Sequence, residues 1–282
     1  MINIWYENAY APGVVRGPVK VISNTVRAFE ESDINFALNI EKYNYNFFLP
    51  WNSVYYEKYL KLKSKKKFLV GPQIWPLSPE FSLLSETDTI IVPSKWVKDL
   101  FETKFKVSGN RILVWPCPIY APSISYSPTI DCLIYFKNRS QQDLYKVKSF
   151  LDEKNITHIQ LSYDHYNQDD FITALSSVKF CVILDNTESQ GVAIQEMMSV
   201  NKPLFVWDQP IWDHQGEQYA VPATSVPYWS DKCGKKFIDF DNVETYFEEF
   251  VNNFDKYSPS EFIDEKLSPQ KSVNILLEHY SK

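Results

Sequence analysis

Two glutamates, Glu188 and Glu196, are separated by seven residues and could bracket a single ligand. The apolar run at residues 180–184 just before them predicts a buried parallel strand, residues 192–200 a helix, and residues 203–207 the next strand. The glutamates therefore belong to a strand–helix–strand unit. α/β proteins bind ligands in such units, at the carboxyl ends of the strands and at helix N-termini.

The spacing suits a phosphorylated nucleoside. Glu188 is expected on the turn between strand and helix, and Glu196 inside the helix, about one and a half turns beyond Gly191. Glycine lets the backbone approach a ligand closely, so the N–H groups from Gly191 through Val192 to Ala193 can receive a diphosphate while Glu196 accepts hydrogen bonds from ribose hydroxyls. The alternative is that both are ordinary glutamates on an exposed helix start and face, where acidic residues are mildly stabilising.

The surrounding chain alternates strand and helix signals in two series. In the first half the predicted strands are residues 2–6, 34–39, 68–70, 89–92 and 111–115, and the predicted helices are residues 19–31 and a segment after Ser94. A proline-rich stretch at residues 116–128 has no periodic apolar pattern and predicts a linker.

The alternation restarts after the linker. Strands are predicted at residues 132–136, 156–161, 180–184 and 203–207, and helices at residues 141–153, 169–177, 192–200, 243–254, 259–266 and 272–279. The sequence thus predicts two α/β domains, residues 1–120 and residues 121–282, that meet across a cleft. The last helix is a candidate to return to the first domain.

Composition narrows the classes of function. The chain has 282 residues and a net charge of −6, without an extended basic stripe, so nucleic-acid binding is not favoured. The basic cluster at residues 61–67 is interpreted as a solvated loop before a strand, with weak contact to anionic lipid headgroups as an alternative. Because no signal peptide and no apolar run of bilayer length are recognised, a cytoplasmic protein without a transmembrane segment is expected.

Other groupings of reactive residues predict little chemistry. The mixture of Asp208, Asp213 and His214 favours a hydrogen-bonded loop over a site for a divalent ion. The chain has no Gly-x-Ser-x-Gly elbow, no Walker A loop and no Gly-x-Gly-x-x-Gly turn. The cysteines are far apart, form no paired metal spacing and are expected to be reduced and packed. They are Cys117, Cys132, Cys181 and Cys233.

With Glu188, Gly191 and Glu196 in the second of two α/β domains, the chain resembles the retaining nucleotide-sugar glycosyltransferases of the two-Rossmann-domain (GT-B) architecture. The likeness is to the family with the Glu-x7-Glu motif (glycosyltransferase family 4-like). Residues 90–101, 111–118 and 197–204 are similar to further segments of that family, whereas Gln190 replaces its usual phenylalanine. The resemblance implies an α/β fold with two Rossmann-like domains facing a central cleft.

The resemblance also implies roles for residues of the second domain. Glu188 is the catalytic candidate, and the donor-binding candidates on the motif are Gln190, Gly191, Val192 and Glu196. In the family an Arg and a Lys follow the first strand of this domain and bind the donor phosphates. Lys137 and Arg139 are their counterparts here, since guanidinium and ammonium groups both suit phosphate oxygens. A solvated basic turn is the alternative.

In the first domain, the resemblance points to the loop at residues 11–18. Gly17 and Arg16 are donor-binding candidates there, with a simple strand-to-helix turn as the alternative. Many relatives present a histidine from this domain near the sugar, but all four histidines of this chain lie in its second half. Gln73 is an acceptor-side candidate in its place, although a structural role in its loop is the alternative.

The implied activity is transfer of a sugar, with retention, from a nucleoside diphosphate donor to a glycan, a glycoconjugate or another hydroxyl acceptor. The family generally needs no metal, and no other cofactor is expected. The alternative is a non-catalytic two-lobed protein that binds nucleotide sugars or carbohydrates.

Overall fold

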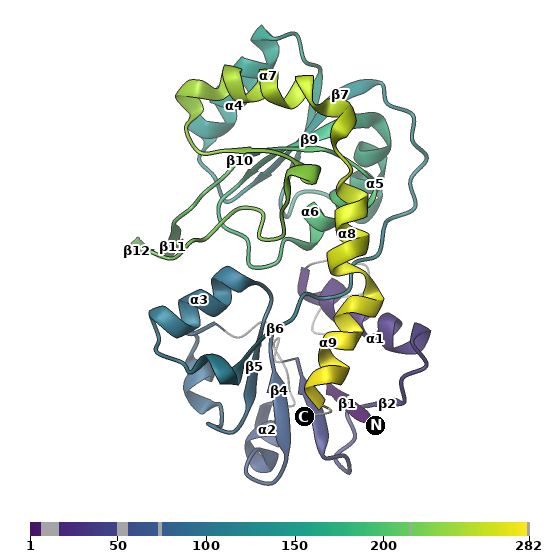
Figure 1. The fold of residues 1–282 in the computed structure, drawn as a ribbon, viewed down its shortest axis with the longest axis vertical. Helices are drawn as coiled ribbons and strands as arrows, with labels where there is room; N and C mark the ends of the chain where they lie inside the picture. Colours follow the sequence, from purple (N-terminus) through teal and green to yellow (C-terminus); the bar gives the residue numbers. More distant parts are fainter. Residues whose placement is uncertain (7–16, 50–55, 73–74, 215, 281–282) are drawn as a thin grey trace. The chain divides into compact units, whose positions relative to one another are not determined.

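The computed structural model describes residues 1–6, 17–49, 56–72, 75–214 and 216–280. The chain divides into two compact units, which are coloured along the sequence in Figure 1. Unit 1 comprises Met1–Pro118 and Leu267–Lys282, and unit 2 comprises Ile119–Lys266. The predicted boundary lay between residues 120 and 121.

Unit 1 is built on a parallel sheet of six strands in the order β2-β1-β3-β4-β5-β6. The strands are short, and β1, β3, β4 and β5 are mostly buried, as is usual for the strands of a parallel sheet, whereas the edge strand β2 is half-exposed. Their bounds are β1 (Ile2–Trp5), β2 (Phe36–Leu38), β3 (Tyr45–Phe48), β4 (Lys67–Val70), β5 (Thr89–Val92) and β6 (Ile112–Val114).

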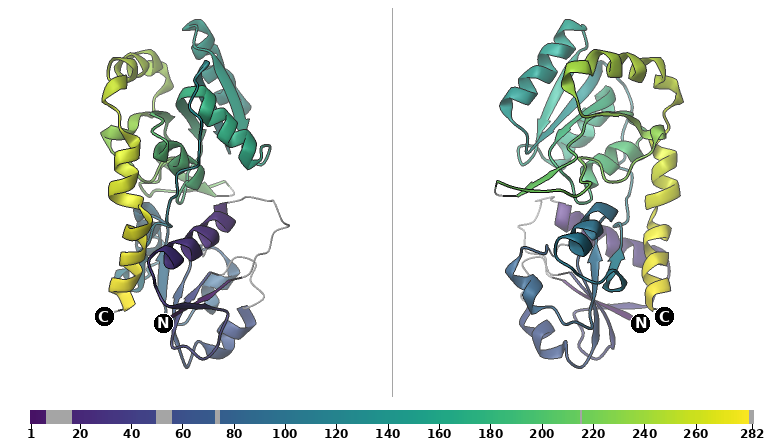
Figure 2. Two further views of the ribbon diagram at one scale, coloured as in Figure 1. Left: turned by 90° about the vertical axis from the view of Figure 1, so that its right-hand side faces the viewer. Right: turned by 60° about the vertical axis from the view of Figure 1, so that its left-hand side comes forward.

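The helices of unit 1 are α1 (Gly17–Glu31), α2 (Tyr56–Leu62), α3 (Lys95–Thr103) and α9 (Pro269–Tyr280). The last of these comes from the end of the chain and lies next to α1 (Figures 1 and 2). It is attached to the sheet through Trp115, which is fully buried and whose indole N–H donates to the Ser272 carbonyl at 3.0 Å. The C-terminal helix therefore belongs to the N-terminal unit.

Unit 2 contains a second parallel sheet of five strands in the order β13-β10-β9-β7-β8. Its strands are β7 (Ile130–Lys137), β8 (His158–Ser162), β9 (Val178–Asp185), β10 (Leu204–Trp207) and β13 (Gly234–Phe237). A small antiparallel hairpin, β11 (Trp212–His214) and β12 (Glu217–Tyr219), follows β10.

Five helices complete unit 2, and two of them share a face of the sheet. They are α4 (Gln141–Glu153), α5 (Gln168–Ser177), α6 (Val192–Ser199), α7 (Val243–Asn252) and α8 (Pro259–Leu267). Alternate residues of β7, β9 and β10 form one hydrophobic cluster with α4 and α7, whose rings Phe150 and Phe247 meet at 5.4 Å. The strands β7 and β9 lie side by side in this packed layer.

Several elements differ from the sequence-based expectation. The strand β3 and the helix α2 were not predicted, and the basic cluster at residues 61–67 divides between the end of α2, a turn and the start of β4. In that cluster the Lys66 ammonium donates to the Tyr43 carbonyl at 2.8 Å. All four cysteines are free and buried. Among the described residues, no helix combines the length and the apolar character needed to cross a membrane.

Candidate functional site

The strand order of the second sheet changes direction between β7 and β9. From β7 the chain crosses through α4 to β8 on one side, and from β9 it crosses through α6 to β10 on the other. In open parallel sheets, ligands bind in the crevice beyond the carboxyl ends of the strands at such a switch point. The two strands end together here, because their last residues, Lys137 and Asp185, are register partners.

Lys137 and Glu188 meet at this switch point. The Lys137 ammonium donates to Glu188 Oε1, and it also lies 4.6 Å from the centroid of the Tyr163 ring. Only 15% of the Lys137 side chain and 11% of the Glu188 side chain are exposed. The structure therefore brings together the predicted catalytic glutamate and one of the two predicted phosphate-binding cations, in a partly desolvated setting where charges interact strongly.

A second carboxylate lies behind this pair. Asp185 is fully buried, its Oδ1 accepts from the Asn186 N–H at 2.7 Å, and its Oδ2 lies 3.8 Å from Lys137 Nζ. At that distance the contact is an ion pair without a hydrogen bond. Burial raises the pKa of Asp185 to about 6, although the neighbouring Lys137 opposes the rise. Sequence reasoning did not identify Asp185.

The turn that follows has a conformation that favours glycine. Gly191 has φ +78°, in the left-handed region, and it precedes the first residue of α6. The Gln195 amide closes the turn from inside the helix by donating to the Gln190 carbonyl at 2.7 Å. The first N–H groups of α6, beginning with that of Val192, have no partners within the helix, as at every helix start. This geometry presents N–H donors and the positive end of the helix dipole to an anion.

Glu196 lies on α6 and is only 6% exposed, and Glu188 is only 9% exposed. Neither glutamate therefore lies on an exposed helix face, as the alternative interpretation required. Acidic side chains are seldom buried without a function or a partner. Burial raises the pKa of Tyr166 to about 12, and the charge of Glu196 also raises it.

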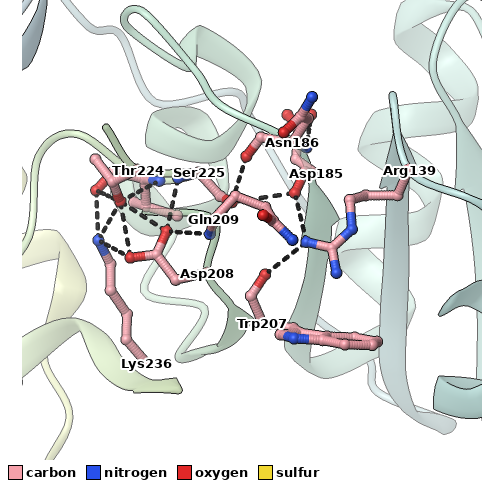
Figure 3. A network of polar contacts seen from close by, with 10 residues as sticks. Arg139, Asp185, Asn186, Trp207, Asp208, Gln209, Thr224, Ser225 and Lys236 are labelled. Carbon is pink, nitrogen blue, oxygen red and sulfur yellow. Dashed lines mark hydrogen bonds and ion pairs between the residues drawn. The ribbon is translucent and has the colours of Figure 1, made fainter. Parts of the chain in front are cut away.

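The Arg139 side chain contacts several other residues of unit 2. Its side chain is 5% exposed, stacks on the Trp207 ring at 4.5 Å, and donates to Asp143 Oδ2 at 3.0 Å. Its Nη1 also donates to the carbonyls of Asp185 and Trp207, each at 3.3 Å (Figure 3). With its side-chain oxygen turned toward the guanidinium, Gln209 accepts at 2.7 and 3.2 Å. Arg139 thus joins the ends of β9 and β10, and its predicted contact with donor phosphates stays a prediction.

Asp208 forms a neighbouring network after β10 (Figure 3). Its carboxylate accepts from the Thr224 hydroxyl at 2.8 Å and the Ser225 N–H at 2.7 Å, and lies 3.5 Å from Lys236 Nζ. The Ser225 hydroxyl in turn donates to the Asp185 carbonyl at 3.1 Å. Asp208 is therefore part of a hydrogen-bonded loop, as favoured from the sequence. The partners on residues 224–236 were not identified, because no sequence signal links them to β10.

The remaining candidates come from the first domain. Gly17 is the first residue of α1 in unit 1, and a Cβ added there would meet no atom of the described residues within 4 Å. Arg16 and Gln73 lie outside the described residues.

A scan against protein-family models finds no match, and a search of curated proteins finds none. Comparison with solved structures does find similar folds. The lipopolysaccharide outer core galactosyltransferase WaaB is similar with a TM-score of 0.62 at 12% sequence identity, over 99% of each chain. Sucrose-phosphate synthase from Thermosynechococcus elongatus is similar with a TM-score of 0.50 at 11% identity, over 97% of this chain and 81% of that chain.

TarM from S. aureus, in a structure that holds fondaparinux, alpha-GlcNAc-glycerol and UDP, is similar with a TM-score of 0.51 at 12% identity. The match covers 92% of this chain and 58% of that chain. At these identities the likeness is one of fold. The predicted fold class is thereby confirmed: the chain is an α/β protein with two Rossmann-like domains of the GT-B type.

Proposed function

We propose that this protein is a retaining glycosyltransferase that moves a sugar from a nucleoside diphosphate donor to a hydroxyl acceptor on a glycan or glycoconjugate. The observation that carries the proposal is the buried pair of Lys137 and Glu188 at the switch point of the second sheet, close in sequence to the N-terminus of α6. An ammonium and free backbone N–H groups suit a diphosphate, and a carboxylate suits sugar hydroxyls.

Each residue has a role in this proposal. Lys137 neutralises the departing diphosphate, and the N–H groups of α6 from Val192 onward bind its oxygens beside Gly191 and Gln190. Glu188 holds sugar hydroxyls and favours positive charge that develops on the anomeric carbon. Glu196 accepts hydrogen bonds from the ribose. Lys137 is bound to Glu188 in this structure, so a diphosphate would compete with Glu188 for the ammonium.

In the proposed reaction the bond between the anomeric carbon and the diphosphate oxygen breaks, and a bond to the acceptor oxygen forms on the same face of the sugar. The acceptor proton passes to the leaving diphosphate. We assign no covalent nucleophile. We propose that the ammonium and the helix N-terminus meet the diphosphate charge without a metal ion or other cofactor.

The acceptor side is assigned to unit 1 by the resemblance alone. Gln73 stays a prediction for that side of the site, and Gly17 and Arg16 stay predictions as donor-binding residues from unit 1. The cleft between the two domains and a weak contact of the 61–67 segment with anionic lipid are likewise predictions.

The direct test is to incubate the protein with UDP-, GDP- and ADP-sugars and measure donor hydrolysis and transfer. We expect turnover of one donor, reduced about 100-fold or more by Glu188→Gln, because a charge that stabilises a transition state contributes on this scale. Glu196→Ala should weaken donor binding about 10-fold or more, as expected for hydrogen bonds to a charged group. Glu248→Gln, an exposed carboxylate on α7, is the matched control and should change neither.

The outcomes separate the two functions drawn from the sequence. If no donor binds by calorimetry, both the transferase and the nucleotide-sugar-binding protein are excluded. Binding of a donor without hydrolysis or transfer to any acceptor favours the non-catalytic binding protein. Turnover that survives Glu188→Gln unchanged removes Glu188 from the chemistry.

A further inference from the structure

Asp185 is an incompletely bonded carboxylate at the centre of the switch point. It is fully buried at the end of β9, yet among the described residues its Oδ2 receives no hydrogen bond. Buried carboxylates ordinarily have several donors, because burying the charged form without them is costly. Among the described residues, Lys137 forms an ion pair with Oδ2, at 3.8 Å. The charge of Lys137 is the largest of the effects that favour the ionised carboxylate, ahead of the Asn186 N–H and the charge of Arg139.

One ammonium, that of Lys137, faces two carboxylates, Asp185 and Glu188. The charge of Arg139 also lowers the pKa of Asp185, although its guanidinium is paired with Asp143 and donates to the Asp185 backbone rather than to its carboxylate. A diphosphate that binds to Lys137 would therefore bring further negative charge next to a buried carboxylate.

Other described groups around Asp185 are uncharged. The Asn186 N–H on the following turn donates to its carboxylate, and the Ser225 hydroxyl donates to its carbonyl. Burial raises the pKa of Tyr135 on β7 well above its ordinary value, and Tyr166, Asp185 and Tyr163 raise it further. Tyr135 therefore stays a neutral hydroxyl.

We propose that Asp185 is a positioning residue for Lys137: as a carboxylate it holds the ammonium at the switch point, and it becomes the neutral acid when a diphosphate binds there. The inference rests on the proposed function, since it takes the ligand to be a diphosphate at Lys137. The proton comes from the solvent and is bound by the Asp185 carboxylate, so that no other group changes its bonding. Donor binding is then coupled to uptake of up to one proton.

The electrostatic setting supports this coupling. Burial already raises the pKa of Asp185 to about 6, and a further anion a few ångströms beyond Lys137 raises it again, because like charge disfavours ionisation. At pH 7 the unliganded carboxylate is mostly ionised and the liganded one mostly neutral. A purely structural aspartate would keep one protonation state throughout.

The test is calorimetric titration of the full chain with UDP, GDP and ADP in turn, at pH 7.0, in PIPES, HEPES and imidazole buffers. The dependence of the binding enthalpy on the ionisation enthalpy of the buffer gives the number of protons exchanged. We expect wild type to take up about 0.5–1 proton more per nucleotide than Asp185→Asn, whose side chain cannot titrate. The nucleotide's own phosphate titration is common to both proteins and cancels. Asp264→Asn, an exposed carboxylate on α8, is the matched control and should equal wild type.

A second measurement needs no variant. With wild type alone, raising the pH from 7 to 8 should weaken nucleotide binding by up to about tenfold, the limit for one proton taken up. If a nucleotide binds but wild type and Asp185→Asn exchange equal numbers of protons, the inference is overturned while the proposed function stands. A wild-type affinity that does not change with pH also overturns the inference while the proposed function stands. This measurement can be made even if Asp185→Asn fails to fold. If none of the three nucleotides binds, the proposed function is overturned and this inference with it.

Discussion

Replacing Arg139 by alanine distinguishes a structural role at the strand ends from a role in phosphate binding. In the structure its guanidinium is almost fully buried and donates to the carbonyls that end β9 and β10 and to the Asp143 carboxylate. It also stacks on Trp207. Truncation leaves two carbonyls and one carboxylate without this donor, in a region from which water is largely excluded.

The magnitude follows from these contacts. Each buried group that loses its donor costs about 1–3 kcal/mol, and a desolvated cation–π contact contributes about 1–2 kcal/mol. Asp143 is partly exposed and can recover water, and the contacts are not independent, so the low ends of these ranges apply. We expect Arg139→Ala to lower the free energy of unfolding of unit 2 by about 3–5 kcal/mol.

The assay is urea unfolding monitored by hydrogen exchange of peptides from β9 and β10, which gives the free energy of unfolding of unit 2 separately. Arg27→Ala is the control, because that arginine is exposed and forms a surface ion pair with Glu31, so its loss should change stability by less than about 0.5 kcal/mol. A loss below about 1 kcal/mol for Arg139→Ala, together with weakened nucleotide binding, would refute the structural role and restore the predicted phosphate contact.

Three further predictions concern unit 2. Gly234→Ala should destabilise it by about 3 kcal/mol or more in thermal unfolding, because Gly234 has φ +140° and an added Cβ would lie 1.9 Å from a carbonyl oxygen of β10. Burial lowers the pKa of Lys202 in the folded protein from 10.5 to about 8, so between these pH values the unfolded chain binds more protons than the folded chain. Stability should therefore rise by about 2 kcal/mol over that range in wild type relative to Lys202→Met, as measured by urea unfolding at each pH. Lys137→Met should weaken nucleotide binding about 10- to 100-fold in calorimetry, whereas the exposed Lys146→Met on α4 should not.

The strands of both sheets were predictable where they are continuous apolar runs. The strand β9 is such a run, and burial on both faces of a parallel sheet requires one. The strand β3 was not predicted: it is only four residues long, and its second residue is the polar Asn46. In the structure Asn46 is fully buried, and its side-chain oxygen accepts from Asn3 at 3.2 Å and from the Trp5 indole at 2.8 Å. These partners lie more than 40 positions away, so the local sequence could not indicate them.

For the candidate site, too, the sequence could indicate what lies within one segment but not what the fold brings together. Glu188 and Gly191 were predicted because they lie within one strand–turn–helix segment, where spacing determines geometry. The meeting of Lys137 and Glu188 was expected only through the resemblance, because it depends on β7 and β9 being neighbours. In the sequence, Asp185 is an acidic residue at the end of an apolar run, a pattern that does not indicate burial or function. Its burial follows from the strands on either side of β9 and is a property of the folded sheet.

Gln190 is one position at which the chain departs from the family it resembles, and the structure provides a physical reason why a polar residue is tolerated there. The side chains of Gln190 and Gln195 are 5% and 1% exposed, and their amides lie 3.4 Å apart, between Nε2 and Oε1. The Gln195 amide also donates to the Gln190 carbonyl at 2.7 Å. A buried amide is costly only when its hydrogen bonds are missing, and here Gln195, five positions along the chain, accepts one hydrogen bond from the Gln190 side chain. The turn before α6 is thus held by this pair, and loss of the aromatic residue does not argue against an anion site at Gly191.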